Sequence, residues 1–127
     1  MTRRRFSKAE REAVYAKCNG HCAYCGCKIR MDQMQVDHKI PIHMEQAYSA
    51  IGVDLNSFDN LLPACRSCNN YKTTFTIDLF RKMIEEQPQI FERDRPTYRL
   101  AVRYGVITPT PHPVTFYFEQ EGYGESE

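Results

Sequence analysis

The spacing of apolar and polar residues changes along the chain, and each spacing predicts a helix or a strand. Ser7 followed by Glu10 fits a capping box, so a helix is predicted to begin at Ser7 and to end at Asn19-Gly20. Residues 34–38 then read as a short strand. Pro41 ends that strand, because proline has no backbone N–H to donate to a sheet.

The middle of the chain predicts a second strand followed by a helix. Residues 42–59 form a long connection with a helical turn within 43–50. The connection leads to Leu61-Leu62, which suits a short strand antiparallel to the first. A helix is predicted from Asn69 through Lys72. These elements together indicate an α+β fold.

The C-terminal half predicts two helices and a strand. The first helix covers residues 76–87, is closed by Pro88 and buries an apolar face made of Leu79, Phe80, Met83 and Ile84. The second helix covers residues 96–104 and stops at Gly105. Residues 114–118 alternate like a strand.

Length and composition limit the class of protein. A chain of 127 residues with 42% hydrophobic content suits a single domain over residues 1–127 with one modest core. No apolar run is long enough to span a membrane, and no apolar stretch follows the basic N-terminus. We therefore expect a cytoplasmic protein that makes no membrane contact.

The net charge of +1 conceals an uneven distribution of charged residues along the chain. Residues 1–30 carry eight basic and two acidic side chains, whereas residues 119–127 carry four acidic ones. The basic N-terminal region suits nucleic-acid binding, although a solvated surface explains it equally well. We expect the acidic tail, residues 119–127, to be disordered.

Four of the six cysteines form two Cys-x2-Cys pairs, Cys22 with Cys25 and Cys65 with Cys68. Four thiolates bind Zn²⁺ tetrahedrally and leave no open position for water, so the predicted site is structural. It would tie the two pairs together across the 39 residues that separate them. Cys18 and Cys27 are left out of this site.

Asp37-His38 places a carboxylate beside an imidazole on the first predicted strand. Neighbours on a strand point to opposite faces, so the two side chains need a local twist or further groups to act together. Asn60, Asn69 and Lys72, which surround the second cysteine pair, are the candidate partners.

These residues carry a resemblance to a known family. The segment Val36-Asp37-His38-Lys39-Ile40-Pro41, followed by Asn60-Leu61-Leu62-Pro63-Ala64-Cys65-Arg66-Ser67-Cys68-Asn69 and Lys72, resembles the HNH endonucleases. The resemblance implies a ββα-metal fold over residues 18–75, with residues 76–118 as a helical extension. The four cysteines are typical of one branch, which resembles the phage endonuclease that resolves four-way DNA junctions. Small standalone HNH proteins are common in phages and prophages, and by this association other phage or host proteins are candidate partners of the chain.

The resemblance also implies roles for individual residues. His38 would be the general base, and Asp37 and Asn69 would hold one catalytic metal ion. Asn69 stands where many members have histidine, although the HNH module of RNA-guided DNA nucleases has asparagine. Asn60 would fix the loop that aims His38, and Arg66 and Lys72 are candidate phosphate contacts.

The ligand types indicate which metal ion the catalytic site would hold. A carboxylate and an amide oxygen are hard ligands, so they favour Mg²⁺ or Mn²⁺ over softer metals. The expected activity is hydrolysis of double-stranded or branched DNA that leaves a 3′-hydroxyl and a 5′-phosphate.

Two other histidines offer alternatives. His43 is an alternative base, and His21 is an alternative zinc ligand.

Two other functions compete with this one. A non-catalytic zinc module that binds nucleic acid or protein would need only the cysteines and the basic N-terminus. A ribonuclease or bacteriocin-like toxin would need an attached delivery domain. A pure binding module has no need for Asp37, His38 and Asn69 together.

Overall fold

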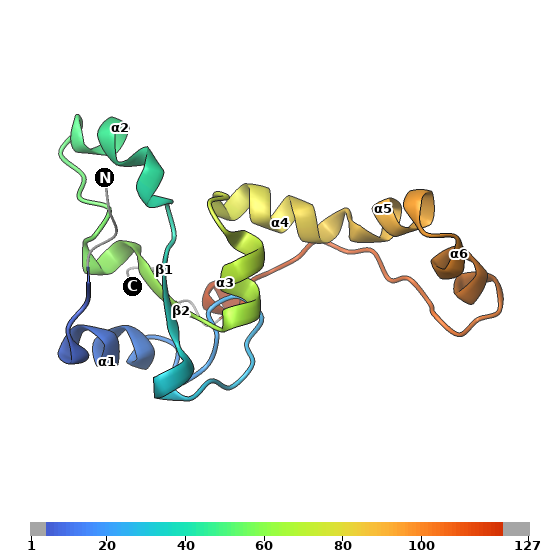
Figure 1. Ribbon diagram of the computed structural model, residues 1–127, viewed down its shortest axis with the longest axis horizontal. Helices are drawn as coiled ribbons and strands as arrows, with labels where there is room; N and C mark the ends of the chain where they lie inside the picture. The colour runs from blue at the N-terminus through green and yellow to red at the C-terminus, as the bar shows by residue number, and fades with distance from the viewer. Residues whose placement is uncertain (1–4, 121–127) are drawn as a thin grey trace. The chain divides into compact units, whose positions relative to one another are not determined.

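The computed structural model describes residues 5–120 (Figure 1). Its internal contacts divide the chain into two compact units, residues 1–77 with 115–127 and residues 78–114. The second unit corresponds to most of the predicted helical extension. Residues 115–118 were expected in that extension, but they belong to the first unit.

The first unit begins with helix α1, Lys8–Ala16, and its predicted capping box is confirmed. The backbone N–H of Ser7 donates to Glu10 Oε1 at 2.8 Å, and the N–H of Glu10 donates to Ser7 Oγ at 3.1 Å. Asn19 and Gly20 end the region with positive φ angles of 54° and 83°. Val14 faces inward and packs in a core with Met34, Val36 and Leu61.

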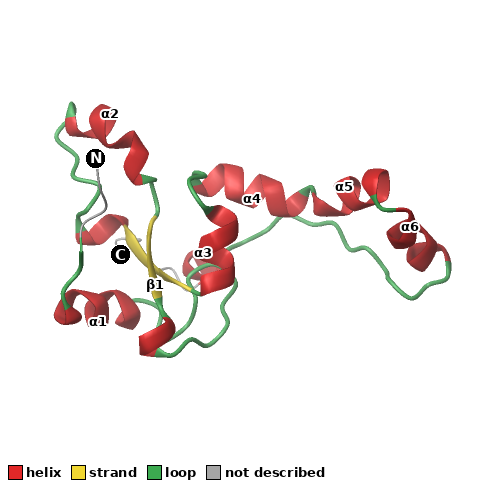
Figure 2. Cartoon of the chain, viewed as in Figure 1, coloured by secondary structure: helices red, strands yellow, loops and turns green. Residues whose placement is uncertain are grey.

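Two short strands follow, as predicted, with a helix after the second (Figure 2). Strand β1, Gln35–His38, pairs antiparallel with β2, Leu61–Ala64. Helix α3 covers Arg66–Lys72 and packs against β1, which completes the ββα arrangement. The connection between the strands contains two 3-10 turns, Ile42–Met44 and Phe58–Asn60, and the short helix α2, Glu45–Ser49. Another 3-10 turn, Met31–Gln33, precedes β1.

Helix α3 begins three residues earlier than predicted, at Arg66 instead of Asn69. The reason is that Cys65 caps the helix, since its Sγ accepts a hydrogen bond from the backbone N–H of Cys68 at 3.4 Å. The second cysteine pair therefore forms the start of the helix and does not precede it.

The predicted strand at residues 114–118 is wrong. Residues 111–116 form neither helix nor strand, and the short helix α7 covers Tyr117–Gln120. Glu119 Oε1 accepts a hydrogen bond from the N–H of Phe116 at 2.8 Å, which favours the helical turn. Residues 119 and 120, expected in the disordered tail, lie in α7, and residues 121–127 lie outside the described chain.

Three helices occupy the second unit or its border, namely α4, Ile77–Glu85, α5, Gln87–Asp94, and α6, Pro96–Arg103. Pro88 does not close a helix as predicted, because it lies in the first turn of α5, where its missing N–H costs no helical hydrogen bond. Gly105, with a φ of 74°, follows α6 as expected. Phe80 is buried, but Leu79 is 54% exposed, so the predicted apolar face of α4 is only partly internal.

No helix within residues 5–120 combines the length and apolar character needed to cross a membrane.

Candidate active site and zinc knuckle

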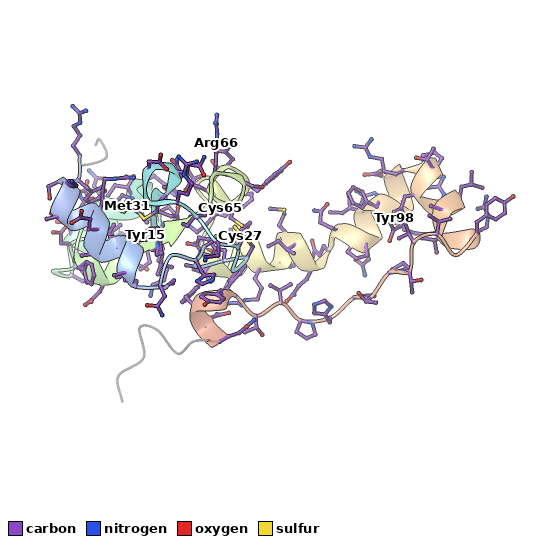
Figure 3. The ribbon with its side chains drawn as sticks, turned by 90° about the horizontal axis from the view of Figure 1, so that it is seen from below. Tyr15, Cys27, Met31, Cys65, Arg66 and Tyr98 are labelled. Carbon is purple, nitrogen blue, oxygen red and sulfur yellow. The ribbon has the colours of Figure 1, made fainter. Side chains whose placement is uncertain are left out.

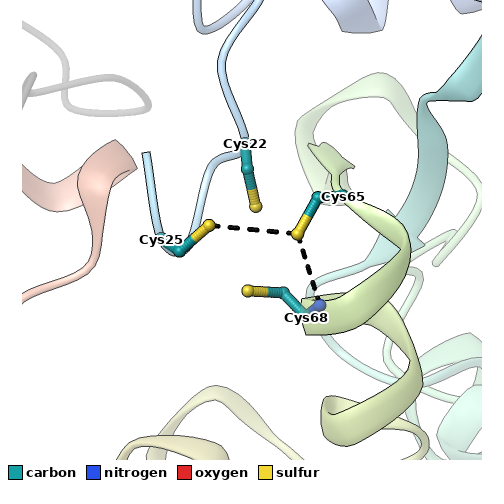
Figure 4. Close-up of side chains that lie close together, drawn as sticks. All are labelled: Cys22, Cys25, Cys65 and Cys68. Atoms are coloured by element: carbon teal, nitrogen blue, oxygen red, sulfur yellow. Dashed lines mark hydrogen bonds between the residues drawn. The ribbon is translucent and has the colours of Figure 1, made fainter. Parts of the chain in front are cut away.

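The two cysteine pairs form a single cluster. The ligand atoms of Cys22, Cys25, Cys65 and Cys68 all lie within 4.8 Å of one another (Figure 4). A tight turn places the first pair, with the N–H of Cys22 donating to the Cys27 carbonyl at 2.8 Å. Gly26 has a φ of 81° in this turn, and a Cβ there would lie 2.9 Å from the ring of Tyr117. Both the conformation and the close contact therefore require glycine.

The electrostatics of the cluster fit a bound dication. A hydrogen bond with the Cys68 thiol lowers the pKa of Cys22 to about 4, with help from backbone N–H groups and against the effect of burial. The same hydrogen bond raises the pKa of Cys68. Four thiols this close cannot all ionise unless a cation lies among them, and Zn²⁺ takes four thiolates in this arrangement.

The two remaining cysteines and His21, the alternative ligand, are not among the four clustered ligands of the described residues. Cys18 is buried and Cys27 is exposed. His21 Nδ1 lies 3.2 Å from the carbonyl oxygen of Cys18, and its ring stacks on Tyr117. Cys18 and His21 are therefore not among the clustered ligands, whereas the Cys27 thiol interacts with those of Cys25 and Cys65 at the edge of the cluster.

A cavity of about 280 Å³ brings the predicted catalytic residues together. Asp37 and His38 line it from β1, and Asn69 lines it from α3. Adjacent strand residues normally face opposite sides, but β1 ends at His38 and both side chains reach the cavity there. The remaining lining residues are Pro41, Ile42, Asn70, Thr73 and Thr74.

The imidazole of His38 is held by Asn56, a residue that sequence analysis missed. His38 Nε2 lies 2.8 Å from Asn56 Oδ1. Because an amide oxygen can only accept, Nε2 carries the proton and Nδ1 is the nitrogen with a free lone pair. His38 is only 3% exposed, so the amide of Asn56 faces Nε2 inside the protein.

Asn60 bridges the two chain segments that carry His38 and Asn56. Its Oδ1 accepts from the N–H of Ile40 at 2.8 Å. Its Nδ2 donates to the carbonyl oxygens of Ile40 and Leu55 at 3.0 and 2.8 Å. Ile40 lies two residues after His38, and Leu55 lies one residue before Asn56. This geometry suits the predicted loop-fixing role of Asn60.

Two side chains hydrogen-bond to the carboxylate of Asp37. The hydroxyl of Tyr24 donates to Oδ2 at 2.5 Å, and Lys72 Nζ lies 3.0 Å from the same oxygen. Burial, together with the charge of Asp37, raises the pKa of Tyr24 well above its usual range, so the phenol stays a donor. Sequence analysis missed Tyr24, although its place between Cys22 and Cys25 indicated that it lies beside the zinc site.

Lys72 does not fit the predicted phosphate contact. Its side chain is fully buried, and its ammonium binds Asp37 and the carbonyl oxygen of His38, the latter at 2.9 Å. A buried lysine needs such partners, and they leave its charge unavailable to DNA. Arg66, in contrast, is exposed at the start of α3 and projects outward (Figure 3).

Comparisons with known proteins agree with this geometry. A model of the HNH endonuclease family matches residues 22–75. The structure is similar to the crystal structure of the Type II-C Cas9 enzyme from Actinomyces naeslundii, with a TM-score of 0.50 and 22% sequence identity. That match covers 65% of this chain but only 8% of the Cas9 chain. No curated protein sequence matched the chain.

The family match, the two strands followed by a helix and the four-cysteine cluster all involve the same residues. Residues 22–75 thereby match the HNH endonuclease family, and the cysteine cluster fits its zinc-binding branch.

Proposed function

We propose that the chain is a metal-dependent endonuclease that hydrolyses phosphodiester bonds of double-stranded or branched DNA. The observation that supports this most directly is that Asp37, His38 and Asn69 line one cavity. Members of the HNH family need these residue types together, whereas a zinc module that only binds DNA has no use for them.

His38 is the general base in this proposal. With its Nε2–H held by Asn56, Nδ1 can take a proton from a water molecule that attacks phosphorus. The products are a 3′-hydroxyl and a 5′-phosphate. The exposed guanidinium of Arg66 would bind a DNA phosphate and help to place the backbone over the cavity.

Asp37 and Asn69 would hold a single Mg²⁺ or Mn²⁺ ion. Their oxygens are hard ligands, and among the described residues no group hydrogen-bonds to Asp37 Oδ1. When bound, the ion supplies Lewis acidity at the phosphate and stabilises charge on the leaving 3′ oxygen. The cysteine cluster has no open position, so its zinc would not itself bind water or substrate.

Plasmid cleavage tests the proposal. Supercoiled DNA should be nicked or linearised with Mg²⁺ or Mn²⁺, and EDTA should stop the reaction. His38→Ala should lower the cleavage rate by about 10²–10⁴-fold, the usual contribution of a general base. If zinc-loaded protein binds DNA but cleaves none with either metal, the non-catalytic binding module is the better explanation.

His43→Ala is the matched control. His43 is exposed, and its Nε2 lies 3.2 Å from the carbonyl oxygen of Thr74. Its loss should leave the cleavage rate within about threefold of wild type. A large loss in His43→Ala with a small one in His38→Ala would assign the base to His43 instead.

A further inference from the structure

We propose that Tyr24 is a positioning residue for the metal-binding carboxylate of Asp37, so that the zinc knuckle is part of the catalytic-metal site. This inference rests on the proposed function. Its basis is the hydrogen bond between the Tyr24 hydroxyl and Asp37 Oδ2.

Tyr24 is held firmly at the knuckle. It lies between Cys22 and Cys25, and its backbone N–H donates to Cys22 Sγ at 3.4 Å. Its carbonyl oxygen accepts from the N–H of Tyr117 at 3.0 Å. Its ring packs edge-on against Phe116 at a centroid distance of 5.3 Å and an angle of 81°. The ring therefore has little freedom to move when the cysteines are fixed by a metal.

The second donor to Asp37 comes from α3. Lys72 Nζ binds the same oxygen, Oδ2, and also the carbonyl oxygen of His38. Two donors on one oxygen fix the rotation of the carboxylate. The other oxygen, Oδ1, accepts no hydrogen bond from the part of the chain that the structure describes. Oδ1 is thus the oxygen of Asp37 that is left to bind a metal ion.

This arrangement has a consequence for metal binding. Removal of a group that hydrogen-bonds to a metal-binding side chain typically lowers metal affinity or activity by about 10–100-fold. Loss of the Tyr24 hydroxyl should therefore weaken binding of the catalytic metal even though Tyr24 is not itself a ligand.

Tyr24→Phe tests the inference, because it removes one oxygen and keeps the ring. Mn²⁺ binding to the zinc-loaded full chain would be measured by electron paramagnetic resonance, beside the Mn²⁺ dependence of plasmid cleavage. We expect full zinc content and a 10–100-fold rise in the Mn²⁺ Kd. If Tyr24 only packs the core, Mn²⁺ affinity will equal that of wild type, and this result would overturn the inference.

Tyr15→Phe is the matched control. The Tyr15 hydroxyl donates to the carbonyl oxygen of Ile29 at 2.7 Å, so the variant also loses one tyrosine hydrogen bond, but outside the cavity. Its Mn²⁺ affinity should not change. If Tyr24→Phe fails to fold, 4-fluorophenylalanine at position 24 carries the test, since its fluorine fills the space of the hydroxyl but donates no hydrogen bond. The same loss of affinity is expected, and unchanged affinity would overturn the inference.

Wild-type protein separates the two proposals. If wild type neither binds Mn²⁺ nor cleaves DNA, the proposed function fails, and the inference fails with it. If wild type does both and Tyr24→Phe matches it, only the role of Tyr24 fails.

Discussion

His38 Nε2 and Asn56 Oδ1 lie 2.8 Å apart, although 17 residues separate them in the chain. Asn56 lies in the long connection between the strands. This connection therefore supplies the side chain that favours one tautomer of His38, the proposed general base.

Asn56→Ala should lower the cleavage rate, because the imidazole loses the acceptor that keeps the proton on Nε2. We expect a drop of about 10–100-fold with an unchanged fold, measured in steady-state plasmid cleavage with Mg²⁺. A rate equal to wild type would show that the hydrogen bond does not matter for catalysis.

Asn56→Asp should shift the pH dependence of cleavage. The new carboxylate stabilises the imidazolium form of His38, so the base stays protonated to a higher pH. The acid limb of the pH–rate profile should therefore move to higher pH than in wild type. A profile that does not move would mean that residue 56 does not face the titrating group.

Asn60→Ala should destabilise the protein as well as slow cleavage. The variant leaves the N–H of Ile40 and the carbonyl oxygens of Ile40 and Leu55 without their partner. Each buried group left unpaired costs about 1–3 kcal/mol. Denaturant unfolding should show a loss of about 2–5 kcal/mol when some of the groups find water. A stable variant that nevertheless loses cleavage would indicate a direct catalytic role.

Cys25→Ser and Cys27→Ser form a matched pair for the zinc site. Both cysteines are exposed and lie two residues apart, but only Cys25 belongs to the cluster. Cys25→Ser should lose zinc and unfold at a lower temperature, whereas Cys27→Ser should keep one zinc per chain and its wild-type melting temperature. Metal analysis and thermal unfolding check both variants. Zinc loss in both would place Cys27 in the site.

Lys17 should make stability depend on pH above neutrality. Burial lowers the pKa of Lys17 to about 8, with the charge of Asp59 acting in the opposite direction. Between pH 8 and about 10.5 the unfolded chain then binds more protons than the folded one at this position, so stability rises with pH. The melting temperature of wild type should increase over this range relative to Lys17→Met. A constant difference would contradict a lowered pKa.

The elements around the motif were predictable because their signals are local. The capping box of Ser7 and Glu10 and the stop at Gly105 depend on residues close in the chain, and each of the two strands was predicted from its own segment. The cysteine spacing likewise indicated the cluster before its geometry was known.

The errors arose where distant contacts decide the outcome. The alternation at residues 114–118 resembles a strand, but Phe116 and Phe118 are buried beside Tyr24, about 90 residues earlier, and the segment turns into α7. Lys72 looks like a surface cation in the sequence, yet its partner Asp37 lies 35 residues away. Neither Tyr24 nor Asn56 could be assigned without the fold, since no spacing rule connects them to Asp37 or His38.

The return of the chain after residue 114 has a consequence for how this protein can be shortened. The N–H groups of Tyr117 and Phe118 donate to the carbonyl oxygens of Tyr24 and Ala23, at 3.0 and 2.8 Å. The second unit is therefore an insertion within the first, and truncation after residue 77 would strip the backbone partners from the knuckle. A shortened chain that keeps the first unit whole would instead lose residues 78–114 and retain the segment from residue 115.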